Sequence, residues 1–208
     1  MRIAFFGDVV GRAGRDGLAD HLPGLRRDLA LEFVVVNAEN AAAGFGITEN
    51  TAREIFDAGA DCLTLGNHSW DQKEALTYIV REPRLIRPAN YPILSDAPGR
   101  GSNLFQTQSG RTVFVVNLLG RVHMDAMDDP FAAADRELAK APLGEVADFL
   151  RFHSPSVRWM AMRMKRMTRA LSTPQIRTLC WYWRGTAKFR KIRAKMKTLS
   201  ALRESSIR

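Results

Sequence analysis

RIAFFGDVVG, residues 2–11, opens with a short apolar run and ends in a polar turn. Two later stretches repeat this arrangement: FVVVN at 33–37 leads into Glu39 and Asn40, and DCLTL at 61–65 leads into Asn67 and His68. Short runs of β-branched and aromatic residues, each ended by glycine or polar residues, are typical of buried strands. We therefore predict a strand in each of the three stretches, the first of them at residues 2–6.

Residues 15–30 and 48–58 carry helical spacing between these runs. Leucines recur every three or four residues in the first segment, and the second begins at Thr48, a good N-cap residue, and stops before Gly59. Strands that alternate with helices of this length indicate βαβ units and a mostly parallel sheet. Further strands are expected at 103–107 and 112–118, joined by a hairpin-like turn. The predicted fold class is therefore α/β.

The net charge of +9 is unevenly distributed over the 208 residues. Residues 1–146 hold 15 basic and 20 acidic residues, a balance of −5, whereas residues 147–208 hold 16 basic and 2 acidic residues, a balance of +14. A chain of this length suits one ample domain with an appendage, since domains run to roughly 100–200 residues. We expect a domain at 1–146 and a basic tail, helical or disordered, at 147–208.

Neither a leader nor a membrane span is expected from the sequence. The N-terminal apolar run is far shorter than the core of a signal peptide, and no apolar stretch approaches the ~20 residues that span a bilayer. Cys62 and Cys180 form no C-x-x-C pair, so a disulfide framework and a cysteine zinc site are not indicated. The expected location is the cytoplasm, and the sequence leaves open whether the chain forms a homo-oligomer.

Polar side chains follow each of the first three predicted strands. Because neighbouring parallel strands end at one edge of a sheet, Asp8, Glu39, Asn40, Asn67 and His68 are expected to converge there. Carboxylate and amide oxygens together with imidazole suit manganese, iron or zinc. Two such ions about 3.5–4 Å apart can hold the attacking and leaving oxygens of a phosphoryl displacement. The pattern indicates a metal centre for phosphate chemistry.

Six motifs, in this order and spacing, resemble the calcineurin-like metallophosphoesterases of the bacterial YmdB type: GDVVG (7–11), NAENAAAGFG (37–46), GNHSWD (66–71), RPANYP (87–92), NLLGR (117–121) and DDPF (128–131). The resemblance covers residues 1 to about 146. It implies the N-terminal part of an α/β/β/α sandwich and two divalent metal ions, most often iron or manganese. It also implies that the substrate is a small phosphodiester such as a 2′,3′- or 3′,5′-cyclic nucleotide.

The same resemblance implies a role for each residue at the predicted strand ends. Asp8, Glu39, Asn40 and Asn67 match the positions of metal ligands, and His68 matches the residue that protonates the leaving oxygen. An imidazole suits that role because its ordinary pKa lies near neutrality. Trp70 and Asp71 are expected to start the next helix, with Trp70 covering the core and Asp71 favouring the positive helix end.

The chain departs from this family after residue 146. The family supplies three more histidine ligands in D-F-H-A-E and G-T-H-T-H motifs, and this chain has neither motif; we assign no ligand role to His153, which stands in RFHSPS. We hypothesise that the reading frame changes near residue 147 and that the chain is truncated. Metal binding is then expected to be weak, and the sequence leaves open whether the chain catalyses. Translation of the gene in its other two frames tests this hypothesis.

Several alternatives stay open at this point. Asp8 alone suits a helix N-cap, and RPANYP suits either the substrate side or a turn packed on the core. A dinucleotide-binding fold fits less well, because the glycines at 7, 11 and 14 have the spacing G-x3-G-x2-G and Asp8 would repel a pyrophosphate. A second function also remains: residues 155–208, basic with an amphipathic stripe, resemble modules that bind nucleic acid or anionic membranes.

Overall fold

The computed structural model describes residues 1–142, 144–153 and 177–182. A five-stranded parallel sheet has the order β4-β3-β2-β1-β8, and a second sheet has the order β5-β6-β7. The first sheet consists of β1 (Arg2–Gly7), β2 (Phe33–Asn37), β3 (Cys62–Thr64), β4 (Leu85–Ile86) and β8 (Arg177–Tyr182). The second consists of β5 (Ser102–Gln106), β6 (Thr112–Asn117) and β7 (Phe149–His153). Strand β6 pairs antiparallel with β5 and parallel with β7.

Alternate residues of β1 pack into two different hydrophobic cores, one on each face of the first sheet. Ala4 and Phe6 pack with the residues that face the helices, whereas Ile3 and Phe5 pack with Val113 of the second sheet. This alternation follows from the two-residue repeat of a strand. The first sheet is therefore buried on both faces, which explains why its strands read as continuous apolar runs.

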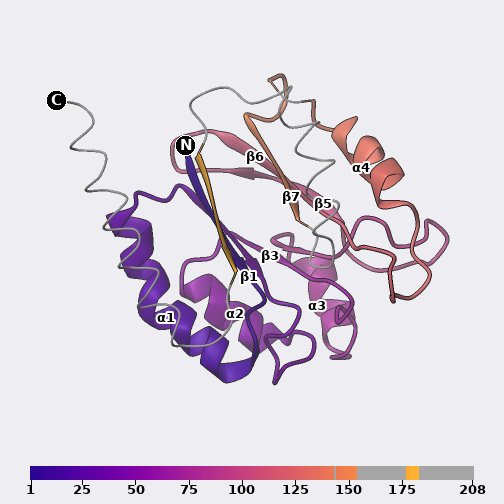
Figure 1. Ribbon diagram of the computed structural model, residues 1–208, viewed down its shortest axis with the longest axis horizontal. Coiled ribbons are helices and arrows are strands. Elements are labelled where there is room, and N and C mark those ends of the chain that lie inside the picture. Colours follow the sequence, from indigo (N-terminus) through magenta and orange to yellow (C-terminus); the bar gives the residue numbers. More distant parts are fainter. Residues whose placement is uncertain (143, 154–176, 183–208) are drawn as a thin grey trace.

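Three helices cover the outer face of the first sheet, and one covers the second sheet (Figure 1). They are α1 (Gly11–Asp28), α2 (Glu49–Asp57) and α3 (Ala75–Arg81) on the first sheet, and α4 (Pro130–Leu138) on the second. Ala133 and Ala134 of α4 pack on Phe114 and Val116 of β6. The layers run helix, sheet, sheet, helix, which confirms the α/β/β/α sandwich expected from the sequence.

Helix α2 shows how local sequence sets its boundaries. Thr48 caps it, because the Thr48 hydroxyl accepts from the Thr51 N–H at 3.2 Å and the Thr51 hydroxyl accepts from the Thr48 N–H at 2.9 Å. The chain leaves the helix at Gly59, whose φ of +109° is a conformation that favours glycine. Both ends lie where the sequence predicts them.

Two segments differ from their sequence predictions. Helix α1 begins at Gly11 rather than residue 15, because Gly14 lets the first turn pack against Val9. The sequence predicts helix or disorder after residue 146, whereas β7 and β8 are strands that complete the edges of β6 and β1. The rest of that stretch lies outside the described residues.

In the described part of the chain, no helix combines the length and the apolar character that crossing a bilayer requires.

Candidate metal centre

The carboxyl ends of β1, β2 and β3 are tied to one another by backbone contacts. The Val9 N–H donates to the Asn37 carbonyl at 3.1 Å, and the Ala38 N–H donates to the Thr64 carbonyl at 3.0 Å. The Asp8 N–H donates to Oδ1 of Asn37 at 3.3 Å. These contacts bring the polar turns after the three strands to one edge of the sheet, as predicted. We call this edge, with Asp8, Glu39, Asn40, Asn67 and His68, the rim.

Asp8 and Asn40 meet directly across the rim. Nδ2 of Asn40 donates to Oδ1 of Asp8 at 2.9 Å. Asp8 has a φ of +57°, in the left-handed region that aspartate tolerates better than most residues. It does not cap α1, whose N-cap is Val10 and has no side-chain cap bond. The N-cap alternative for Asp8 is therefore wrong.

Glu39 buries its carboxylate at the centre of the rim. The residue is 4% exposed, and Oε2 has no hydrogen-bond partner among the described residues. Burial raises the pKa of Glu39, and the Asp8 carboxylate adds to the rise, while the Asn37 amide, the charge of His68 and the His68 peptide N–H oppose it. A buried carboxylate oxygen without a donor is costly unless a cation meets it. Glu39 is thus suited to a metal.

Gly66 makes room for this carboxylate. A Cβ at residue 66 would lie 1.9 Å from Oε2 of Glu39, so no side chain fits at this position without displacing Glu39. The next residue, Asn67, is exposed, and it is followed by His68, whose N–H approaches the same carboxylate. The structure therefore places Asn67 in the turn that wraps Glu39. The roles of Asp8, Glu39, Asn40 and Asn67 as metal ligands stay predictions.

His68 is oriented by two neighbours. Its Nδ1 lies 2.6 Å from Oδ2 of Asp71, and its ring meets the ring of Phe45 edge-on with centroids 5.1 Å apart. Because Asp71 occupies Nδ1, the imidazole keeps Nε2 for a ligand at the rim. The prediction that Asp71 starts a helix is wrong, since α3 begins at Ala75. Trp70 packs on the core, as predicted.

Two buried amides, Asn117 and Asn90, have structural roles. Nδ2 of Asn117 donates to the Leu65 carbonyl at 2.7 Å and approaches the Ile86 carbonyl at 3.3 Å, so this residue of β6 joins the two sheets next to Gly66. Asn90, fully buried, donates to the Leu119 carbonyl and accepts from the Leu119 N–H. The RPANYP turn thus packs on the core at Asn90. In the sequence, only the NLLGR motif (117–121) marks Asn117, and nothing in it predicts that this residue links the two sheets.

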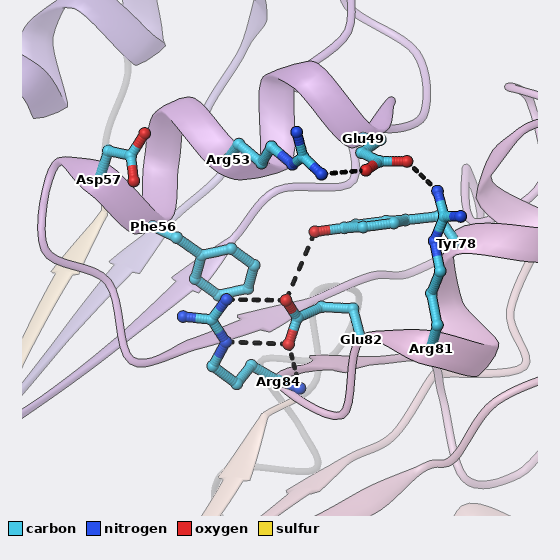
Figure 2. Close-up of a pocket in the computed structure, with 8 residues that line it drawn as sticks. All are labelled: Glu49, Arg53, Phe56, Asp57, Tyr78, Arg81, Glu82 and Arg84. Carbon is cyan, nitrogen blue, oxygen red and sulfur yellow. Dashed lines mark hydrogen bonds and ion pairs between the residues drawn. The ribbon is translucent and has the colours of Figure 1, made fainter.

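A hollow of about 420 Å³ lies elsewhere, between α2 and α3. Figure 2 shows that its arginines are already paired: Arg53 and Arg81 with Glu49, and Arg84 with Glu82. Arg84 also lies over the ring of Phe56, 3.8 Å from its centroid. None of the rim residues lines this hollow. The paired charges indicate a surface network that joins the two helices.

Within the described residues, no three or more His, Cys, Asp and Glu side chains are grouped to hold a metal. Asp8 and His68 each lie close enough to Glu39 to influence its pKa, and the other donors of the rim are the amides of Asn40 and Asn67. His153 ends β7 in register with Asn117 of β6. Residues 154–176 and 183–208 lie outside the described part of the chain.

An α/β/β/α sandwich with carboxylates, amides and an imidazole at its strand ends is the architecture of the metallophosphoesterase class. The sequence pattern of YmdB-like proteins matches residues 4–164, and the chain belongs to this family. The match continues 18 residues beyond the predicted boundary at 146.

Individual relatives agree with this placement. The chain is 41% identical over 154 residues to a 2′,3′-cyclic-nucleotide 2′-phosphodiesterase of Bacillus subtilis, a match that covers 74% of this chain and 57% of that enzyme. A crystal structure of a hypothetical Thermus thermophilus protein superposes with a TM-score of 0.72 at 30% identity, over 90% of this chain and 79% of the other. The crystal structure of a phosphatase from Mycoplasma pneumoniae superposes with a TM-score of 0.69 at 27% identity, over 81% of this chain and 60% of the other.

Proposed function

We propose that this chain hydrolyses a phosphodiester bond with the help of two divalent metal ions, iron or manganese. A 2′,3′- or 3′,5′-cyclic nucleotide is the proposed substrate, and the name of the Bacillus relative, a 2′,3′-cyclic-nucleotide 2′-phosphodiesterase, supports the first of these two. The observation that carries the proposal is the buried Oε2 of Glu39, which lacks a donor and faces a glycine beside two further rim residues, Asp8 and His68. A buried carboxylate oxygen without a partner is costly, and a bound cation would remove that cost.

The rim residues fit part of a dinuclear centre. Asp8 and Glu39 supply carboxylate oxygens, and Asn40 and Asn67 supply amide oxygens, all of them hard donors suited to manganese or iron. Asn40 donates its NH2 group to Asp8, which leaves its oxygen for a metal. The proposed centre has fewer protein ligands than the complete family set, so we expect weak binding in this chain.

When bound, the two ions would supply charge to neutralise the phosphate and activate a water molecule. The protein would supply orientation and a proton. Asp71 holds Nδ1 of His68, and the proton on Nε2 would go to the departing alkoxide oxygen. Nothing lies within 4 Å of the Cβ position of Gly44, so the loop beside the rim is open at this residue.

Metal binding tests the proposal first, by thermal unfolding with and without Mn²⁺ after treatment with a chelator. We expect Mn²⁺ to raise the melting temperature of the wild-type chain. In Glu39→Gln the affinity should fall at least about tenfold, the loss typical even for groups that only support ligands. Asp57→Asn, which removes an exposed carboxylate of α2, is the control and should bind as the wild type does. An equal Mn²⁺ response in Glu39→Gln would contradict the site.

Activity tests it second, with bis-p-nitrophenyl phosphate and 2′,3′-cyclic AMP as substrates. Hydrolysis should depend on Mn²⁺ or Fe²⁺, and His68→Ala should lower kcat by about 10²- to 10⁴-fold, the usual contribution of a general acid. His21→Ala, a change in α1, is the control. Metal-stimulated turnover that survives in His68→Ala would rule out the proposed role of this histidine.

The nucleic-acid or membrane contact predicted for residues 155–208 is a separate proposal. Apart from β8, these residues lie outside the described part of the chain. Its test is salt-sensitive binding of the whole chain to RNA or to anionic vesicles, compared with a chain that ends at residue 153. Equal binding by both chains would contradict it.

A further inference from the structure

Phe45 is an exposed aromatic residue beside the rim. It is 59% exposed although its ring contacts the ring of His68 edge-on. Single exposed apolar side chains are common on protein surfaces and carry no meaning alone. Phe45 differs from such residues because it contacts the predicted proton donor and because its backbone is held in place on both sides.

Hydrogen bonds fix the backbone of Phe45 at both of its polar groups. Its N–H donates to the Ala42 carbonyl at 3.1 Å, and its carbonyl accepts from Nε2 of Gln72 at 3.0 Å. The loop is tied to the rim as well, since the Gly44 N–H donates to the Asn40 carbonyl at 3.2 Å. An exposed ring on an anchored backbone loses little conformational entropy when a ligand binds.

The glycines on either side of Phe45 explain how the loop reaches this position. Gly44 and Gly46 have φ values of +100° and +73°, which favour glycine. At Gly46 a Cβ would lie 3.1 Å from the backbone nitrogen of Gln72, so the loop packs directly on the segment that carries Asp71. Phe45 and His68 are thereby held on two segments that contact each other.

We propose that Phe45 is the surface on which the base of a nucleotide substrate stacks while the phosphate occupies the rim. The inference rests on the proposed phosphodiesterase function and assigns it a specificity residue. The open ring is flat and apolar, which suits the π-face of a nucleobase. Its contact with His68 places that base next to the group that would protonate the ribose oxygen. A stacking surface tolerates every base, so we expect preference for nucleotides over base-free phosphodiesters and little preference among bases.

The test compares two probes with the full-length chain in Mn²⁺: 2′,3′-cyclic AMP and methyl ribofuranoside 2′,3′-cyclic phosphate, which lacks the base. Binding is measured by calorimetry under conditions without turnover, at low temperature. The wild type should bind the adenine probe about tenfold more tightly than the base-free probe, within the range measured for stacking of one base on an aromatic residue. Phe45→Ala and Phe45→Leu should lose this difference, whereas Phe45→Tyr and Phe45→Trp should keep it.

Val80→Ala is the matched control, because Val80 of α3 is 63% exposed and lies outside the rim. It should bind both probes as the wild type does, and the melting temperature of every variant shows that it is folded. Equal affinity of wild type and Phe45→Ala for the adenine probe would overturn the inference while the proposed function stands. Failure of the wild type to bind either probe would overturn both.

Discussion

At the scale of single residues, the rim depends on the contact between Glu39 and Gly66. The sequence places both residues at strand ends, and the general rule for parallel sheets predicts that they meet. The sequence does not show that Oε2 of Glu39 lies where the Cβ of residue 66 would be. That relation depends on the path of two turns, which no periodic pattern encodes. The same holds for the contact between Phe45 and His68.

Replacement of Gly66 by alanine should therefore destroy the site. The added methyl group and Glu39 cannot share the same space, so the carboxylate must move or the turn must shift, at a cost of about 1–3 kcal/mol in the free energy of unfolding. We expect urea unfolding to show this loss and Mn²⁺ to give no thermal shift. Gly24→Ala, in the helical backbone of α1, is the control for a glycine substitution, because only the end of the Arg27 side chain lies within 4 Å of its Cβ position. A Gly66→Ala chain that still binds Mn²⁺ would contradict the geometry.

Glu39→Gln tests the same contact from the other side. In a chelator at neutral pH, the neutral amide removes a buried charge, so the free energy of unfolding should rise by about 1 kcal/mol. The expected gain in metal-free stability accompanies a loss of metal binding, and chemical unfolding with and without Mn²⁺ measures both. A variant that is less stable than the wild type in chelator would show that Oε2 has a partner in solution.

At the scale of elements, apolar runs predicted the strands β1, β2, β3, β5 and β6, and helical spacing predicted α1 and α2. The leucine stripe located α1, and Thr48 and Gly59 located α2. The start of α1 was missed because its first turn has no capping side chain and is held by packing of Gly14 on Val9. The strand β8 was missed because its pairing with β1 joins residues about 175 positions apart, a contact that local sequence does not encode.

Two glycines of α1 should respond to alanine in opposite directions. At Gly24 the nearest atom to a Cβ is the end of the Arg27 side chain at 3.9 Å, so Gly24→Ala should stabilise the protein by about 0.5–1 kcal/mol through helix propensity. At Gly14 a Cβ would meet Val9 at 3.0 Å, so Gly14→Ala should destabilise it. Urea unfolding of both variants measures the contrast, and equal effects would contradict the packing of this helix.

The ion pair between Glu82 and Arg84, beside α2 and α3, should make part of the free energy of unfolding depend on pH. The hydrogen bond from Arg84 lowers the pKa of Glu82 below its ordinary value of 4.5. The stabilisation is therefore fully present above that value and is lost as the pH falls through the lowered pKa. The difference in unfolding free energy between wild type and Glu82→Gln should shrink as the pH is lowered from 6 to about 3. A difference that does not change with pH would show that the pair contributes nothing.

At the scale of the whole molecule, both sheets take a strand from the stretch after residue 146. Strand β1, which leads into Asp8, lies between β2 and β8. A chain that ends at residue 153 would leave the backbone groups of β1 unpaired along one edge, and unpaired edges favour association. We expect this shortened chain to unfold at a lower urea concentration and to aggregate on size-exclusion chromatography. A monomeric chain of unchanged stability would show that β8 contributes little.

The hypothesis of a changed reading frame near residue 147 concerns the origin of residues 147–208. The chain spans 57% of the Bacillus enzyme that it matches, and the family pattern continues to residue 164. The nucleotide sequence across codons 140–160 decides whether a change of frame separates this stretch from the family's histidine motifs. Recovery of those motifs in another frame would support the hypothesis, and their absence from both frames would reject it.

The left-handed backbone at Asp8 restricts which mutations this position can accept. Of the residues that one nucleotide change can produce from an aspartate codon, glycine and asparagine suit a φ of +57°, and only asparagine keeps a side-chain oxygen. Valine and tyrosine, also one change away, would strain the turn. Random mutagenesis at residue 8 should therefore recover glycine and asparagine more often than valine or tyrosine among folded variants, and of these two only asparagine keeps an oxygen that could face a metal.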